Sequence, residues 1–370
     1  MPKVSVLMPA YNVEKYIGEC LDSVLGQTLK DIEIICIDDG SKDNTGRIID
    51  EYAEKDNRLS VVHKENSGYG HSMNVALEMA SGDYIGIVET DDFIEKDMFE
   101  RLYTLAVDNN TDVVKTNYYD YYSEKPEKNK KSKTLDIAMM YNEVFSPKDN
   151  QRVFMVAPCI WSGIYRRDLI EDNKIRFTET QGASYQDTAF AFKIWACADS
   201  VLLVDEAYLH YRRDNESSSV NSPGKVFCIC DEYDEIEKFI TTTGKKQYED
   251  VKNVIKFNQY RWNYNRLSLE YRYAFLLRIV AEFQPLRERG ILNSVLFDEN
   301  RLEELNRILD NPQLYFKESS KKKMGGKESV EELLEDNKLL KKQLKEANLN
   351  ITKKIKRRIA KRIKEKDGDR

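Results

Sequence analysis

Short apolar runs alternate with amphipathic stretches along the first 120 residues. Residues 4–8 and 32–37 are short, mostly apolar runs that stop at proline or aspartate, and residues 13–25 between them space apolar side chains as a helix does. The alternation continues, with further strands expected at 59–63, 84–88 and 111–118 and helices at 44–52, 73–80 and 96–107. Buried strands that alternate with helices predict a doubly wound, mostly parallel α/β sheet.

The pattern changes along the rest of the chain. Residues 123–134 are polar and charged, and they predict an exposed loop or lid. From about 224 the spacing is helical and rich in aromatic residues. We therefore expect an α/β domain over residues 1–222, a helical extension over 223–318, a linker over 319–328 and a separate C-terminal segment over 329–370.

The C-terminal segment carries two helical patterns. A heptad repeat, which predicts a coiled coil and a homo-oligomer, is followed by isoleucines every four residues among lysines and arginines, which predict a basic amphipathic helix. A solvated single helix is the alternative interpretation. The residues are Val330, Asn337, Leu344 and Ile351 at a positions, Leu333, Leu340 and Ala347 at d positions, and Ile355, Ile359 and Ile363 in the basic part.

Charge is distributed unevenly along the 370 residues. The net charge is −6, yet residues 321–370 contain 18 lysines and arginines against 9 acidic residues. This basic tail predicts contact with an anionic membrane surface, whereas the acidic body disfavours nucleic acid as a partner. The sequence has no signal-peptide pattern and no apolar stretch long enough to span a membrane. We expect a cytoplasmic protein with peripheral contact at the inner face of the cell membrane.

Three polar clusters follow strands of the predicted sheet. They are Pro9-Ala10-Tyr11-Asn12, Asp38-Asp39 and Glu89-Thr90-Asp91-Asp92. Ligands of doubly wound sheets bind beyond the carboxyl ends of the strands, so the clusters should meet at one site. Carboxylates there suit Mg²⁺ or Mn²⁺ and a diphosphate, although any single aspartate could equally be a turn or cap residue. The sequence has no Gly-x-Gly-x-x-Gly motif after the first strand, which disfavours a dinucleotide oxidoreductase. It also has no Gly-Lys-Ser/Thr phosphate loop.

These motifs resemble the opening of family-2 glycosyltransferases with the GT-A fold, a Rossmann-like α/β sheet flanked by helices. The matching motifs are closely spaced over residues 1–120 and become fewer towards residue 220. The resemblance rests on Val4 to Asn12, Gln27-Thr28, Ile37 to Ser41 with Asp43, Asn66-Ser67-Gly68, Met73-Asn74, Ala80 to Ile85, Glu89 to Phe93, Trp161 to Arg166, Tyr185 to Phe190, and His210 to Arg213 with Ser218-Ser219.

The resemblance implies a donor site for a nucleotide sugar. Tyr11 would stack near uracil and Asp39 would accept a hydrogen bond from it. Two residues depart from the family pattern: Glu89 replaces the first aspartate of the Asp-x-Asp motif, and Met73 replaces an arginine. The implied donor-site residues are Pro9, Tyr11, Asn12, Glu14, Asp39, Asn66, Gly68, His71, Asn74, Glu89, Thr90, Asp91 and Arg212.

The resemblance also implies a catalytic base and a metal. Asp187 stands where inverting members have the carboxylate that deprotonates the acceptor hydroxyl, although a helix cap is the alternative role. Asp91, Asp92 and His210 are the expected ligands of Mn²⁺ or Mg²⁺, although a lone histidine is more often structural. Trp161 and Gln186 are expected on the acceptor side, with a core tryptophan as the alternative.

The function expected from the sequence is thus a metal-dependent, inverting, hexosyltransferase-type enzyme. It would move a sugar, most simply from a UDP-sugar, to a glycan or lipid-linked acceptor in surface polysaccharide biosynthesis. The alternative is a catalytically degenerate scaffold in a glycan assembly complex, which the Glu89 and Met73 departures motivate. A sugar-phosphate nucleotidyltransferase shares the sheet plan but lacks support, because no glycine-rich basic loop follows the first strand.

Overall fold

The computed structural model describes residues 1–132, 140–180, 182–215, 225–292 and 295–321. The chain divides into two compact units, residues 1–255 and 256–370. The heptads and basic helix expected over 329–370, and most of the linker expected over 319–328, lie outside the described residues.

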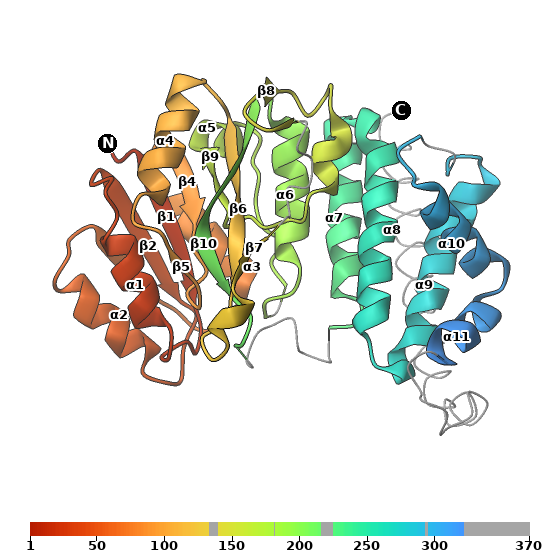
Figure 1. The fold of residues 1–370 in the computed structure, drawn as a ribbon, viewed down its shortest axis with the longest axis horizontal. Helices are drawn as coiled ribbons and strands as arrows, with labels where there is room; N and C mark the ends of the chain where they lie inside the picture. The colour runs from red at the N-terminus through yellow and green to blue at the C-terminus, as the bar shows by residue number, and fades with distance from the viewer. Residues whose placement is uncertain (133–139, 181, 216–224, 293–294, 322–370) are drawn as a thin grey trace, which may run out of the picture. The chain divides into compact units, whose positions relative to one another are not determined.

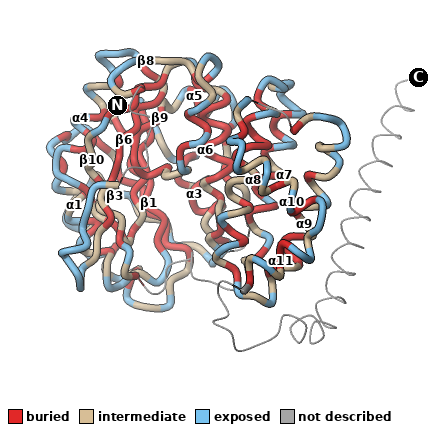
Figure 2. Tube along the Cα trace, turned by 45° about the vertical axis from the view of Figure 1, so that its right-hand side comes forward, coloured by how far each residue is buried: buried red, intermediate tan, exposed pale blue. Residues whose placement is uncertain are grey.

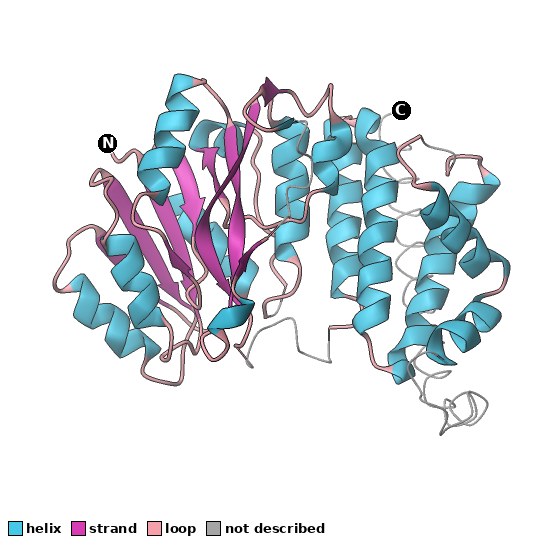
Figure 3. Cartoon of the chain, viewed as in Figure 1, coloured by secondary structure: helices cyan, strands magenta, loops and turns pink. Residues whose placement is uncertain are grey.

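The first unit is built on one mixed sheet in the order β3-β2-β1-β4-β9-β6-β10-β5, with β7 beside β6 and β8 beside β10 (Figure 3). β1 pairs in parallel with β2 and β4, whereas β9 runs antiparallel between β4 and β6. The strands are β1 Val4–Ala10, β2 Ile32–Asp38, β3 Leu59–His63, β4 Tyr84–Ile87, β5 Phe93–Ile94, β6 Val113–Tyr121, β7 Lys130–Lys131, β8 Val144–Phe145, β9 Gly163–Arg166 and β10 Val201–Arg212.

Helices flank this sheet, as the ribbon in Figure 1 shows. They are α1 Ile17–Leu25, α2 Thr45–Ala53, α3 Tyr69–Met79, α4 Met98–Asp108, α5 Arg167–Asp172 and α6 Gln186–Cys197. Helix α7 Cys228–Thr243 packs against α6, and short 3₁₀ turns lie at η1 Pro126–Lys128, η3 Gln151–Met155 and η5 Lys246–Tyr248. All seven residues of β1 are buried, and the sheet forms the core of the unit (Figure 2). The expected GT-A type of α/β fold, a central sheet flanked by helices, is confirmed.

Two helices, α1 and α3, begin four residues away from the start that the sequence predicts. Helix α1 begins at Ile17 rather than 13, because the Val13 and Glu14 amides donate to Thr45 Oγ1 and Asp43 Oδ2 and so turn the chain towards the start of α2. Helix α3 begins at Tyr69, four residues earlier than expected, directly after Gly68 with its φ of 93°. Contacts distant in sequence thus set the start of α1, and the backbone conformation of Gly68 sets the start of α3.

The second unit is helical in its described residues. Its helices are α8 Glu249–Arg266, which begins in the first unit, α9 Leu269–Glu288, α10 Glu299–Asp310 and α11 Pro312–Lys321. Aromatic side chains form its core: Tyr260 lies 5.3 Å from Phe275 and Phe257 lies 5.8 Å from Phe283, centroid to centroid. Among the described helices, none combines the length and apolar character that crossing a membrane requires.

Candidate active site

The polar clusters lie at the edge of the sheet where β1, β2 and β4 end. Asp39 directly follows β2, and its amide donates to Ala10 O, the last residue of β1, at 2.9 Å. The segment 89–92 follows β4, which lies on the other side of β1. The strand-end rule therefore brings two of the predicted clusters to one edge of the parallel part of the sheet, next to the third at residues 9–12.

Asp39 is buried and organises the loop before α3. Its Oδ1 accepts the Ser67 amide at 2.8 Å and pairs with Lys64, and its Oδ2 accepts the Gly68 amide at 2.9 Å. A Cβ at position 68 would lie 2.4 Å from Thr180 O, so only glycine fits there. Asn66 precedes these two amides and is exposed.

Asn12 and Glu14 bind the loop that leads into α2. The Asn12 amide donates to Ser41 Oγ at 3.0 Å, and Asn12 Oδ1 accepts the Lys42 amide at 2.7 Å. Glu14 Oε2 accepts both the amide and the side-chain nitrogen of Asn44, at 2.9 and 2.8 Å. Both side chains are thus engaged with the protein, whereas neighbouring Tyr11 is 48 % exposed and leaves its ring open to a ligand.

Glu89 lies at the end of β4 opposite Tyr69, the first residue of α3. The Tyr69 hydroxyl donates to Glu89 Oε1 at 2.7 Å. Burial, together with the negative charges of Asp91 and Asp187, raises the pKa of Glu89 to about 8 despite this hydrogen bond. Asp91 and Asp187 are therefore each close enough to influence Glu89, although Asp187 is about 100 residues away in sequence.

Hydrogen bonds hold the other residues of the acidic segment, Thr90 to Asp92. They come from Thr90 itself and from Arg212 at the end of β10. Thr90 Oγ1 donates to Pro9 O at 2.7 Å, so both residues hold the strand ends together. The Arg212 amide donates to Asp92 Oδ1 at 2.8 Å, and its guanidinium Nε donates to Asp91 O at 2.9 Å. Buried Arg212 also pairs with Glu19 and thus faces protein groups.

Asp91 and Asp92 differ in exposure. Asp91 is half-buried, and its Oδ2 accepts Asn215 Nδ2 at 2.8 Å. Asp92 is 1 % exposed, and its Oδ2 is buried with no hydrogen-bond partner among the described residues. Burial and the charge of Asp91 raise the pKa of Asp92 well above its ordinary value. A divalent cation would relieve this repulsion between neighbouring carboxylates, so the pair fits a metal.

His210, one of the predicted metal ligands, contacts protein groups. Its Nε2 lies 2.9 Å from Glu95 Oε1, and its ring is stacked on Phe93 with 4.4 Å between centroids and on Tyr119 with 5.0 Å. Among the described residues, no cluster of three or more His, Cys, Asp or Glu side chains is arranged to hold a metal.

Asp187 lies in the first turn of α6. The helix follows Tyr185, whose φ of 64° turns the chain into it. Burial raises the pKa of Asp187 to about 7, against the opposing effects of hydrogen bonds from Thr188 and of the positive charge of Lys115. Near neutral pH a carboxyl group with this pKa exists in both forms, as a general base requires.

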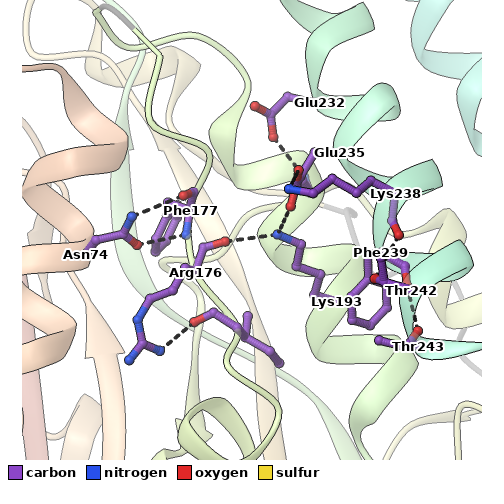
Figure 4. Close-up of polar contacts among 12 residues, drawn as sticks. Asn74, Arg176, Phe177, Lys193, Glu232, Glu235, Lys238, Phe239, Thr242 and Thr243 are labelled. Carbon is purple, nitrogen blue, oxygen red and sulfur yellow. Dashed lines mark hydrogen bonds and ion pairs between the residues drawn. The ribbon is translucent and has the colours of Figure 1, made fainter. Parts of the chain in front are cut away.

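The segment before α6 is attached to α3 and α6 (Figure 4). The Phe177 amide donates to Asn74 Oδ1 at 2.8 Å, and Asn74 Nδ2 donates to Phe177 O at 3.1 Å. Arg176 O accepts Lys193 Nζ at 3.1 Å, and that ammonium pairs with Glu235 on α7 at 3.0 Å. These contacts position the segment that carries Asp187.

Gln186 at the start of α6 and His71 on α3 are two further predicted site residues. Gln186 is buried, and its side-chain nitrogen donates to Thr180 Oγ1 at 2.8 Å and to Gly182 O at 3.1 Å. It therefore holds Thr180 and Gly182 close to the start of α6. Half-buried His71 leaves its Nδ1 without a hydrogen-bond partner among the described residues.

Trp161 belongs to an aromatic stack beside β10. The Trp161 and Tyr211 rings are stacked, with 5.1 Å between their centroids and 8° between their planes. The Arg213 guanidinium lies over the Tyr211 ring, 4.4 Å from its centroid. Trp161 is 8 % exposed, so most of its surface is used in this packing.

Three functional candidates were missed at the sequence level: Tyr69, Lys115 and Glu232. Glu232 on α7 is buried and accepts the Ala189 amide in the first turn of α6 at 3.3 Å. Burial, together with the charge of Asp187, raises the pKa of Glu232 to about 8. Only Lys115 left a signal in the sequence, because a lysine interrupts the apolar run that forms β6.

Residues 5–173 match the sequence model of the family described as Glycosyl transferase family 2. This match covers the parallel strands and the strand-end carboxylates, and it supports a family-2 glycosyltransferase domain over these residues. Among its relatives, the glycosyltransferase EpsJ of Bacillus subtilis is 34 % identical over 61 % of this chain and 65 % of its own length. The poly(ribitol-phosphate) beta-glucosyltransferase of Bacillus spizizenii is 29 % identical over 59 % of this chain and 34 % of its own. The chain thus spans less than two thirds of these relatives.

A solved structure shares the fold over most of the chain. The S. aureus TarS fragment 1–349 in complex with UDP-GlcNAc superposes with a TM-score of 0.66 at 24 % identity, covering 87 % of this chain and 92 % of that one. At this identity the likeness concerns the fold alone.

Proposed function

We propose that this chain is an inverting, metal-dependent glycosyltransferase that uses a UDP-sugar. One observation carries the proposal: Glu89 at the carboxyl edge of the sheet interacts electrostatically both with Asp91 and with Asp187 from a distant segment, and burial raises the pKa of Asp187 to about 7. Doubly wound sheets bind their ligands at this edge. The nucleotide sugar named for TarS and the glucosyl transfer named for the Bacillus spizizenii relative support a hexosyl donor.

In this proposal Asp187 acts as the general base. Its carboxylate takes the proton of the acceptor hydroxyl while the acceptor oxygen attacks C1 of the sugar. The bond from C1 to the diphosphate oxygen breaks, UDP departs, and the anomeric configuration is inverted. Base catalysis of this kind contributes about 10²–10⁴ in rate when the pKa lies near the working pH.

Asp91 would hold the cation, with Asp92 behind it. Mg²⁺ and Mn²⁺ are commonly bound by one or two carboxylates and completed by substrate phosphates, so a third protein ligand is not required. When bound, the cation would neutralise charge on the leaving diphosphate. Tyr11, with its open ring, would stack on the uracil, and the Asp39-ordered loop at 66–68 would line the nucleoside side.

The acceptor belongs to the proposal as well. A glycan or a lipid-linked acceptor in surface polysaccharide synthesis would fit a transferase whose basic tail over 351–366, outside the described residues, contacts an anionic membrane. The sheet edge between Asp187 and Trp161 is where we place it.

The test is calorimetric titration with UDP in the presence and absence of Mn²⁺, followed by UDP release from a panel of UDP-, GDP- and dTDP-sugars. We expect UDP binding that Mn²⁺ strengthens and turnover that Asp187→Asn abolishes. Absence of binding by every nucleotide would contradict the proposal. Full biological function of Asp187→Asn would favour the non-catalytic scaffold instead.

A further inference from the structure

The residues that follow β10 lie at the same edge of the sheet as the acidic segment. Strand β10 is parallel to β6, and β6 is parallel to β4, because both β4 and β6 are antiparallel to β9. The carboxyl ends of β4 and β10 therefore lie at one edge. Hydrogen bonds fix the chain beyond β10: the Arg213 amide donates to Tyr121 O at 2.8 Å, and the Ser123 hydroxyl donates to Asp214 Oδ2 at 2.8 Å.

Asn215, the next residue, contacts Asp91 directly. Its Nδ2 donates to Asp91 Oδ2 at 2.8 Å across 124 residues of sequence, and the asparagine is only 6 % exposed. Among the described residues this is the one hydrogen bond that the Asp91 carboxylate accepts, and Asp91 Oδ1 takes part in no hydrogen bond or ion pair. Asn215 thus occupies one oxygen of Asp91 and leaves the other to a ligand.

Asp92 is held in the same way. Its Oδ1 accepts the Arg212 amide at 2.8 Å, whereas its Oδ2 has no hydrogen-bond partner among the described residues. The donors to both carboxylates are amide groups, which fix an oxygen without neutralising the acid as the ammonium of Lys64 does at Asp39. Two neighbouring carboxylates, each with one oxygen fixed and one available, are suited to a hard divalent cation.

The Asn215 contact has the form of an outer-shell interaction at a metal site. Carboxylates that bind metals are themselves hydrogen-bonded, and these partners orient the ligand. Without Asn215 no donor among the described residues would fix the half-buried Asp91 carboxylate against rotation about its last bond. The contacts of Arg213 and Asp214 in turn fix the position of Asn215 itself.

We propose that Asn215 is a positioning residue of the metal site, which holds Asp91 Oδ2 so that Oδ1 is presented to Mn²⁺ or Mg²⁺. The inference rests on the proposed role of Asp91 as a metal ligand. It adds the residue that orients this ligand and identifies the oxygen atom that binds the cation.

Direct measurement of Mn²⁺ binding tests this without depending on turnover. Electron paramagnetic resonance distinguishes free from bound Mn²⁺ and is recorded with UDP at saturating concentration. Asn215→Leu keeps the approximate size of the side chain and removes the donor. We expect the Kd for Mn²⁺ to rise about 10- to 100-fold, whereas the Kd for UDP in EDTA should stay within about twofold. If Asn215→Leu does not fold, Asn215→Ala removes the same donor and replaces it.

Two further variants separate orientation of Asp91 from general packing. Asn117 is 1 % exposed and donates to Asp205 Oδ1 at 2.9 Å, which is the same kind of bond at a carboxylate outside the candidate site. Asn117→Leu should lower the thermal midpoint and leave the Kd for Mn²⁺ unchanged. In an Asp91→Asn background, Asn215→Leu should have no further effect on Mn²⁺ binding, because Asn215 acts through Asp91.

The results distinguish this inference from the proposed function. An unchanged Kd for Mn²⁺ in Asn215→Leu, or an equal loss of UDP affinity in EDTA, would overturn the inference. Mn²⁺ binding that depends on Asn215 in an enzyme with full turnover in EDTA would overturn the metal dependence of the proposed function and support the inference. Absence of Mn²⁺ binding by wild type with UDP would overturn both.

Discussion

Asn74 and Phe177 exchange two hydrogen bonds although 103 residues separate them. Phe177 N donates to Asn74 Oδ1 at 2.8 Å, and Asn74 Nδ2 donates to Phe177 O at 3.1 Å. The side-chain amide thus satisfies both backbone groups of one residue, as a neighbouring strand would. Asn74 Nδ2 also donates to Glu179 Oε1 at 2.9 Å. The contact fastens α3 to the segment that leads to Asp187.

Asn74→Ala should loosen this segment. The buried amide and carbonyl of Phe177 would lose their partners, and each unsatisfied group costs about 1–3 kcal/mol, so we expect the free energy of unfolding to fall by roughly 2–6 kcal/mol. The turnover rate should fall more than UDP affinity, because the segment positions Asp187 rather than the nucleotide. Urea unfolding and calorimetry with UDP and Mn²⁺ measure the two effects.

Asn173→Ala is the matched control. Asn173 Nδ2 makes one hydrogen bond, to Leu169 O within its own helix end, at 2.9 Å. Its replacement should cost about 1 kcal/mol and leave turnover unchanged. Equal effects of the two variants would show that Asn74 has no special link to the active site.

The strand core of the first unit could be predicted from the sequence because its signal is local. Residues 32–37 lie within β2, since a mostly apolar run reports burial on both faces of a sheet, and Leu59–His63 matches its prediction although it is only partly buried. The antiparallel insertion of β9 between β4 and β6 could not be predicted, because strand order is decided by tertiary packing. The two-residue strand β5 is too short to leave a periodic pattern.

The candidate site was predictable to the same extent. The rule that ligands bind beyond the carboxyl ends of parallel strands needs only the positions of the strands. It therefore indicates where Asp39 and Asp91 lie. The partners of a side chain do not follow from the rule: Glu14 caps the start of α2, and Arg212 supports the acidic segment. Lys115 was missed since a lysine within an apolar run has no visible partner until β6 is placed in the sheet.

Tyr11→Ala should weaken UDP binding without unfolding the protein. The ring is 48 % exposed, so its removal creates no cavity. Stacking of a base on an aromatic side chain is worth about 1–3 kcal/mol, so we expect a roughly 5- to 150-fold higher Kd for UDP. Tyr11→Phe keeps the ring and should bind like wild type in the same calorimetric titration. An unchanged Kd in Tyr11→Ala would remove the ring from the nucleoside site.

Asp91→Asn should remove the effect of Mn²⁺ on UDP binding. The substituted amide would keep an acceptor for Asn215 but lose the charge that a hard cation prefers. We expect UDP affinity in Mn²⁺ to fall to the value that wild type shows in EDTA, with the thermal midpoint in EDTA unchanged or higher, because the repulsion on Asp92 is relieved. The control is Asp205→Asn, which removes an exposed carboxylate paired with Lys131 at 3.0 Å. Full Mn²⁺ enhancement in Asp91→Asn would exclude this residue as the ligand.

Asp187→Asn should separate catalysis from nucleotide binding. We expect kcat to fall about 10²- to 10⁴-fold, because the variant cannot accept a proton, while the Kd for UDP stays within about twofold. The protein should become more stable above pH 7, since asparagine removes a charge that burial disfavours. Wild-type kcat should rise with pH and level off above about pH 7, as the base ionises, with roughly a tenfold loss per pH unit on the acid side. Asp168→Asn, which changes a side chain that is 70 % exposed on α5, should leave this profile unchanged. A wild-type profile that is already level at pH 5 would mean that the carboxyl of Asp187 has an ordinary pKa and that another group limits the rate.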